Sequence, residues 1–98
     1  MSTLFIATIT YLASAEDVAA QRPAHRAFLD GFYKEDLLLM SGPMTSGKGG
    51  VLLVRGNISQ QELAQRLSHD PFVTSGVAHY EFCEFNAVKY AAFLEGHI

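Results

Sequence analysis

Four short apolar segments, separated by two segments that carry helix-start signals, most constrain what this chain can fold into. The apolar segments are rich in β-branched and aromatic residues, which favour strands, and they lie at residues 4–12, 37–40, 51–54 and 77–85. The order is strand, helix, strand, strand, helix, strand. This order predicts an α+β chain of the ferredoxin-like β-α-β-β-α-β type, an antiparallel sheet with two helices on one face.

The first helical segment contains a proline. Ser14 is the expected N-cap, and Pro23 follows nine residues later. Because proline lacks a backbone N–H and clashes with the preceding turn, we expect a short first turn and a main helix over about residues 23–35. Ala24, Phe28 and Phe32 recur every four residues and predict the apolar face of this helix.

The second helix is expected to begin at Ser59 and to end at the Asp70-Pro71 pair, since the residue before proline avoids the α region. A short C-terminal helix is predicted over residues 87–94. We expect a single domain over residues 1–98, in which residues 86–98 form a C-terminal extension.

The strands are apolar on both faces. A sheet with helices on one face should alternate apolar and polar residues, but LFIATITY, LLLM and VLLV do not. The face without helices is therefore expected to meet the sheet of a second copy of the chain. This predicts a homodimer.

A glycine-rich stretch, SGPMTSGKGG at residues 41–50, matches most of the phosphate-binding pattern G-x-x-x-x-G-K-[ST]. In that pattern a Ser or Thr follows the lysine and a helix begins there. Here Gly49 follows Lys48, and the next residues predict a strand. We therefore interpret the stretch as a hairpin loop whose glycines allow positive φ, and not as a nucleotide site.

Composition excludes several classes of function. The 98 residues are 49% hydrophobic and 17% charged, as in globular proteins, and the net charge of −3 gives no basic footprint for nucleic acid or an anionic membrane. A single cysteine, Cys83, excludes an internal disulfide framework. Without a signal-like segment or an apolar run of about 20 residues, we expect a cytoplasmic protein with no nucleic-acid or membrane partner.

The histidines do not form a metal-binding pattern. None of the four is spaced two or four residues from another, and no cysteine cluster accompanies them, so no metal is predicted. His25 lies one turn after Arg22, on the same side of the first helix. Taken alone, His25 fits a partly buried structural histidine, and Asp70 alone fits a turn.

Four motifs taken together resemble the YCII-related family. They are RPAHRAFL at residues 22–29, SGP at 41–43, the glycine-rich loop and strand at 47–54, and DPFVTSGV at 70–77. The resemblance extends from the first strand to about Phe85. It implies a ferredoxin-like fold of the dimeric α/β barrel type, in which two copies associate through their sheets.

The resemblance also implies a site. His25 and Asp70 would form a hydrogen-bonded pair, with about 2.6–3.2 Å between a ring nitrogen and a carboxylate oxygen. The residues expected around it, for binding a substrate, are Arg22, Ser41, Gly42, Pro43 and Phe72. The carboxylate would fix the imidazole tautomer and leave the other nitrogen free for proton transfer.

The family includes a dehydrochlorinase and resembles muconolactone isomerases in fold. By resemblance we expect a lyase or isomerase without cofactor that moves a proton on a small phenolic or dienolic acid. The alternative is a non-catalytic dimeric module that binds a small ligand or serves as an accessory domain. Nothing in the sequence names the substrate.

Overall fold

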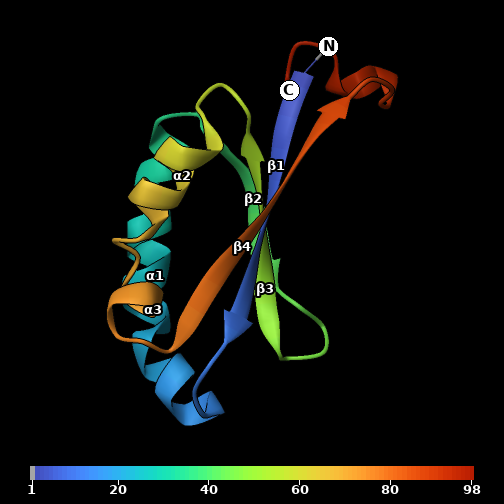
Figure 1. Cartoon of the computed structure of the whole chain (residues 1–98). Coiled ribbons are helices and arrows are strands. Elements are labelled where there is room, and N and C mark those ends of the chain that lie inside the picture. The colour runs from blue at the N-terminus through green and yellow to red at the C-terminus, as the bar shows by residue number, and fades with distance from the viewer. Residues whose placement is uncertain (1) are drawn as a thin grey trace.

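A computed structural model of the chain describes residues 2–98 as a four-stranded antiparallel sheet with helices on one face (Figure 1). The elements in chain order are β1 (Ser2–Tyr11), α1 (Ala15–Lys34), β2 (Leu38–Pro43), β3 (Gly49–Arg55), α2 (Gln60–Leu67), α3 (Pro71–Thr74), β4 (Ala78–Ala87) and the 3₁₀ helix η1 (Ala92–Leu94). The strand order is β2-β3-β1-β4. The predicted ferredoxin-like fold is confirmed.

The core lies between the sheet and the helices. Phe5, Ala7 and Ile9 of β1 are buried on the face toward the helices, and they pair with Val54, Leu52 and Gly50 of β3. Leu63 and Leu67 of α2 are among the side chains that cover this face. None of the helices within residues 2–98 is long and apolar enough to cross a membrane.

Helix α1 differs from the prediction because Pro23 does not interrupt it. One helix runs from Ala15 to Lys34 with Pro23 inside. Pro23 and Ala19, whose carbonyl loses its intrahelical partner, are both exposed, so water can satisfy that carbonyl. Buried residues on both sides of the proline, including Val18 and Leu29, hold the two halves against the sheet.

The buried face of α1 is also shifted from the predicted one. Phe32 is buried, but Ala24 is exposed, and the buried positions in the second half of the helix are His25, Leu29 and Phe32. The spacing of these three residues is that of one helix face. A histidine therefore occupies a position at which the fold would ordinarily place an aliphatic side chain.

The glycine-rich stretch is a hairpin, as predicted, because β2 and β3 pair on either side of it. The reason for its glycines is only partly the predicted one. Gly47 has a φ of 76°, whereas Gly49 lies in β3, and a Cβ there would come within 1.9 Å of the Ile9 carbonyl oxygen. Close approach between strands requires glycine at position 49.

The predicted C-terminal helix over residues 87–94 is wrong. Strand β4 pairs with β1 as far as the Ser2–Ala87 pair, so residue 87 is held in the sheet. After it only Ala92–Leu94 form a short 3₁₀ helix. In Figure 1 this extension lies beyond the end of the sheet, away from the helices.

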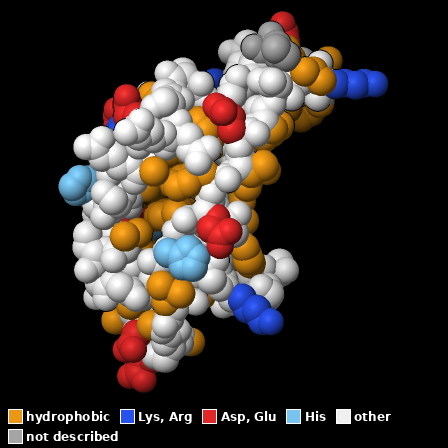
Figure 2. Space-filling model, in the orientation of Figure 1, with side chains coloured by type: hydrophobic (Ala, Val, Ile, Leu, Met, Phe, Trp, Pro, Cys, Tyr) orange, Lys and Arg blue, Asp and Glu red, His pale blue; other side chains and the backbone are white. Residues whose placement is uncertain are grey.

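The face of the sheet that carries no helix is largely apolar. Met40 is 60% exposed, and Val51 and Phe85 are each 37% exposed on this face. Figure 2 shows hydrophobic side chains gathered along the side of the sheet away from the helices. Contiguous apolar surface of this kind is a feature of protein–protein contacts.

We expect this face to form the predicted homodimer. Val51 lies on β3, one of the two central strands, so Val51→Glu should bury an unpaired charge in the interface and yield monomers in light scattering at micromolar concentration. The matched control is Ala19→Glu, which adds the same charge to the exposed side of α1 and should leave the dimer intact. A monomeric wild-type chain under these conditions would contradict the prediction.

Candidate functional site

His25 and Asp70 form a buried pair. His25 comes from the middle of α1 and Asp70 from the junction of α2 and α3, 45 positions later in the chain. The Nδ1 atom of His25 lies 2.7 Å from Oδ2 and 3.0 Å from Oδ1 of Asp70. His25 is 7% exposed and Asp70 is 0% exposed. The predicted contact between the two side chains is confirmed.

Two further donors form hydrogen bonds with the Asp70 carboxylate. Asp70 is the N-cap of α3, where Oδ1 accepts a hydrogen bond of 2.9 Å from the Phe72 backbone N–H. Oδ2 accepts one of 2.5 Å from the hydroxyl of Tyr80 on β4. A buried carboxylate is stable only when it is well hydrogen-bonded, and here the donors come from three separate elements.

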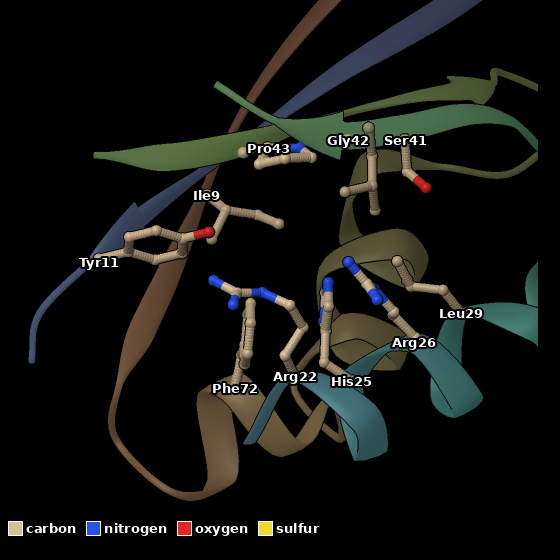
Figure 3. A pocket seen from close by; sticks show the side chains of 12 residues that line it. Ile9, Tyr11, Arg22, His25, Arg26, Leu29, Ser41, Gly42, Pro43 and Phe72 are labelled. Atoms are coloured by element: carbon tan, nitrogen blue, oxygen red, sulfur yellow. The ribbon is translucent and has the colours of Figure 1, made fainter. Parts of the chain in front are cut away.

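This hydrogen bonding fixes the tautomer of His25. An ionised carboxylate only accepts hydrogen bonds, so Nδ1 of His25 must carry the proton that it shares with Asp70. Its Nε2 makes no hydrogen bond to any residue from 2 to 98, and no buried side-chain nitrogen or oxygen in that range lacks a partner. Nε2 is therefore accessible from outside, and Figure 3 shows a ring nitrogen of His25 directed into the cavity.

Stacking on Phe72 restricts the orientation of the His25 imidazole ring. The two rings stack with centroids 3.8 Å apart and an interplanar angle of 2°. Tyr11 in turn meets Phe72 edge to face, with centroids 6.0 Å apart. Such contacts are favourable beyond the area they bury. The hydrogen bond to Asp70 and the stack on Phe72 together leave His25 little freedom.

The cavity beside His25 has a volume of about 140 Å³ and lies between α1 and the sheet (Figure 3). Its lining residues are Ile9, Tyr11, Arg22, His25, Arg26, Leu29, Ser41, Gly42, Pro43, Gly50, Leu52 and Phe72. The lining includes all the residues named from the sequence except Asp70. Asp70 does not line the cavity but binds His25, which does.

A β-bulge turns part of β2 toward this cavity. Leu38 pairs with Val54, but the register then shifts, so that Ser41 pairs with Leu52 and Pro43 with Gly50. Partners in an antiparallel pair share a face, and Leu52 is a core residue. Without the extra residue, Ser41 would face the opposite side of the sheet. The Ser41 hydroxyl also lies 2.7 Å from the hydroxyl of Tyr33 on α1.

The cavity is electropositive. Arg22 and Arg26 both line it, neither forms an ion pair with any residue from 2 to 98, and none of the described lining residues is acidic. Figure 3 shows their guanidinium groups on either side of His25. Unpaired arginines beside an apolar wall favour an anionic ligand, whose oxygens a guanidinium binds through two parallel hydrogen bonds.

Sequence reasoning missed Tyr80 and Arg26. Arg26 follows Arg22 by four residues and so lies on the same side of α1, a signal that was available. Tyr80 faces the helices because it pairs with Ile9. The neighbouring residues His79 and Glu81 lie on the opposite face, where they contact each other at 3.3 Å. Within residues 2–98, no three potential metal ligands lie together.

Comparison with known proteins identifies the family. Residues 1–86 match the sequence profile of the YCII-related domain. The chain belongs to the YCII-related family. No curated protein matches the chain in sequence.

A solved structure with the same fold is 5-chloro-2-hydroxyhydroquinone dehydrochlorinase from Burkholderia phenoliruptrix AC1100, in complex with 2,5-dihydroxybenzoquinone. The two structures superpose with a TM-score of 0.71 at 19% sequence identity, over 85% of this chain and 93% of that one. At this identity the similarity shows a shared fold.

The environment of Tyr80 makes the free energy of unfolding of this YCII-related chain decrease at alkaline pH. Burial, the hydrogen bond to Asp70 and the charge of Asp70 all raise the pKa of Tyr80 above its ordinary value of 10.0. Above about pH 10 the unfolded chain loses this proton while the native state retains it. The unfolded state then binds fewer protons, so the free energy of unfolding falls as the pH rises.

We therefore predict that the contribution of Tyr80 to the free energy of unfolding is constant below about pH 10. Above pH 10 this contribution should fall by up to about 1.4 kcal/mol for each pH unit. Tyr80→Phe should lower the free energy of unfolding by about 1–3 kcal/mol at neutral pH, because one oxygen of the buried carboxylate loses a donor. Urea unfolding from pH 7 to pH 11 should show this difference shrinking above pH 10. A difference that stays constant would contradict the prediction.

Proposed function

We propose that this YCII-related protein is a lyase or isomerase that needs no cofactor and moves a proton on a small anionic organic molecule. The observation that carries the proposal is the position of His25, whose Nε2 opens on a cavity beside two unpaired arginines. An imidazole held as the Nδ1–H tautomer by a carboxylate has a basic Nε2 that can take a proton near neutral pH. Asp70 and His25 are the proposed catalytic pair.

The substrate would bind through its negative charge. In this proposal Arg22 holds a phenolate, enolate or carboxylate oxygen, and Phe72 and Leu52 contact the carbon skeleton. Ser41, Gly42 and Pro43 form the opposite wall, on the edge strand β2. A bound ligand that displaces water from this space strengthens the charge interactions within it.

Nε2 then takes a proton from the bound molecule, and the electron pair of the broken bond moves into an enolate or dienolate. Asp70 stabilises the imidazolium without taking its proton, and Arg22 stabilises the developing oxygen charge. In an elimination the enolate expels a leaving group with its bonding electrons. In an isomerisation the imidazolium returns the proton to a different carbon. Both outcomes use the same first step.

The fold relative supports the choice of a phenolic or dienolic substrate. Its name gives it a chlorinated hydroxyhydroquinone as substrate, and its ligand is a dihydroxybenzoquinone. Molecules of this class are small, planar and acidic, which suits a cavity of about 140 Å³ with apolar walls and two guanidinium groups.

We predict that His25→Ala abolishes proton transfer and also lowers the free energy of unfolding by about 1–3 kcal/mol, because the buried Asp70 carboxylate loses a donor. Circular dichroism should show that the variant is folded under the assay conditions. The assay is deuterium incorporation from D₂O into a panel of phenolic and dienolic acids, together with chloride release from 5-chloro-2-hydroxyhydroquinone. Asp70→Asn should lower kcat by a factor on the order of 10² to 10⁴, since an amide misorients the imidazole without deleting it.

His69→Ala is the matched control, because His69 is exposed at the end of α2, and it should keep full activity. Calorimetry on the same panel separates the alternatives. If wild-type protein binds a member of the panel, loses binding on Arg22→Gln, and yet exchanges no proton, the chain is a ligand-binding module and the enzyme proposal fails.

A further inference from the structure

We propose that Tyr80 is a positioning residue for the site. By holding the Asp70 carboxylate in place, it keeps His25 in the orientation that directs Nε2 into the cavity. The inference rests on the proposed function for its kinetic consequence, but its structural content can be measured without any substrate.

The argument begins with how each oxygen of Asp70 is anchored. The Phe72 backbone N–H binds Oδ1 at 2.9 Å, and the Tyr80 hydroxyl binds Oδ2 at 2.5 Å. These two donors come from α3 and β4, so together they define the plane of the carboxylate independently of His25. Nδ1 of His25 then meets both oxygens, at 2.7 Å and 3.0 Å, as a third donor.

Without the Tyr80 hydroxyl, one of the two anchors is lost. Rotation about the bond to a carboxylate group is intrinsically loose, and Phe72 would be the only remaining anchor besides His25 itself. The carboxylate and the imidazole bound to it would then turn together. Nδ1 would keep its proton, but Nε2 would no longer be held in the direction of the cavity.

The surroundings keep Tyr80 in its role as donor. Its hydroxyl is part-buried and meets a carboxylate that can only accept, so the shared proton belongs to Tyr80. The ring stacks on Phe82, with centroids 6.2 Å apart and an interplanar angle of 14°. Tyr80→Phe therefore deletes the hydroxyl and retains the ring and its packing.

The first test is nitrogen NMR of the His25 ring in protein labelled with ¹⁵N. Wild-type protein should show the Nδ1–H tautomer, and a nuclear Overhauser contact should connect this proton to the hydroxyl proton of Tyr80. In Tyr80→Phe the Nδ1–H resonance should broaden and exchange faster with solvent, because the ring no longer keeps one orientation. The matched control is Tyr90→Phe, which deletes a hydroxyl that also binds a carboxylate, that of Glu95, in the C-terminal extension.

The second test is a double-mutant cycle on the reaction. Tyr80→Phe should lower kcat at least tenfold and change KM less than twofold, because the tyrosine does not line the cavity. In the Asp70→Asn background the same substitution should have almost no effect, since Tyr80 acts through Asp70. Tyr90→Phe should change neither constant in either background.

These outcomes separate this inference from the proposed function. If the Nδ1–H resonance of Tyr80→Phe is as sharp and as slowly exchanging as that of the wild type, or if the substitution lowers kcat equally with and without Asp70, Tyr80 only packs and the inference is overturned. If the resonance changes as expected but no substrate exchanges a proton, the proposed function fails and the positioning role stands. If Tyr80→Phe does not fold, the wild-type Overhauser contact decides, and its absence overturns the inference.

Discussion

The buried carboxylate of Asp70 ties the layers of this protein together. A side chain with no exposure carries its charge at a prohibitive free-energy cost unless donors surround it, and the donors here come from α1, α3 and β4. The same hydrogen bonds join α1, α3 and β4, and they orient the imidazole that we propose as the base. The same atoms therefore contribute to the stability of the fold and to the proposed proton transfer.

The order of elements could be predicted from the sequence because it depends on local pattern, and so could the pairing of His25 with Asp70, because short motifs in the right order indicated the family. Local rules failed where tertiary contacts outweighed them. Pro23 predicts a broken helix, but exposure of Ala19 and burial on both sides of the proline keep α1 continuous. Residues 87–94 have helical composition, but pairing with β1 draws Ala87 into the sheet.

The cavity was harder to predict than the His25–Asp70 pair, for a geometric reason. Whether a strand residue faces the helices depends on register, and one inserted residue reverses it. The bulge in β2 turns Ser41 toward α1, and no turn or glycine signal marks it in the sequence. Tyr80 alternates along β4 with His79 and Glu81, whose side chains lie on the other face. Residues of a site that are contributed by strands therefore need a known register, whereas Arg22 and His25, on one helix, follow from spacing alone.

The cavity and the expected dimer interface lie on opposite faces of the sheet. The cavity lies on the face covered by α1 and opens beside β2, which is an edge strand. The apolar face that we expect to receive a second copy is the opposite one, where Met40 and Val51 are exposed. Association through that face leaves His25 and its arginines accessible. It would also cover the outer side of the strands that carry Ser41 and Tyr80, and so restrain the positions of both.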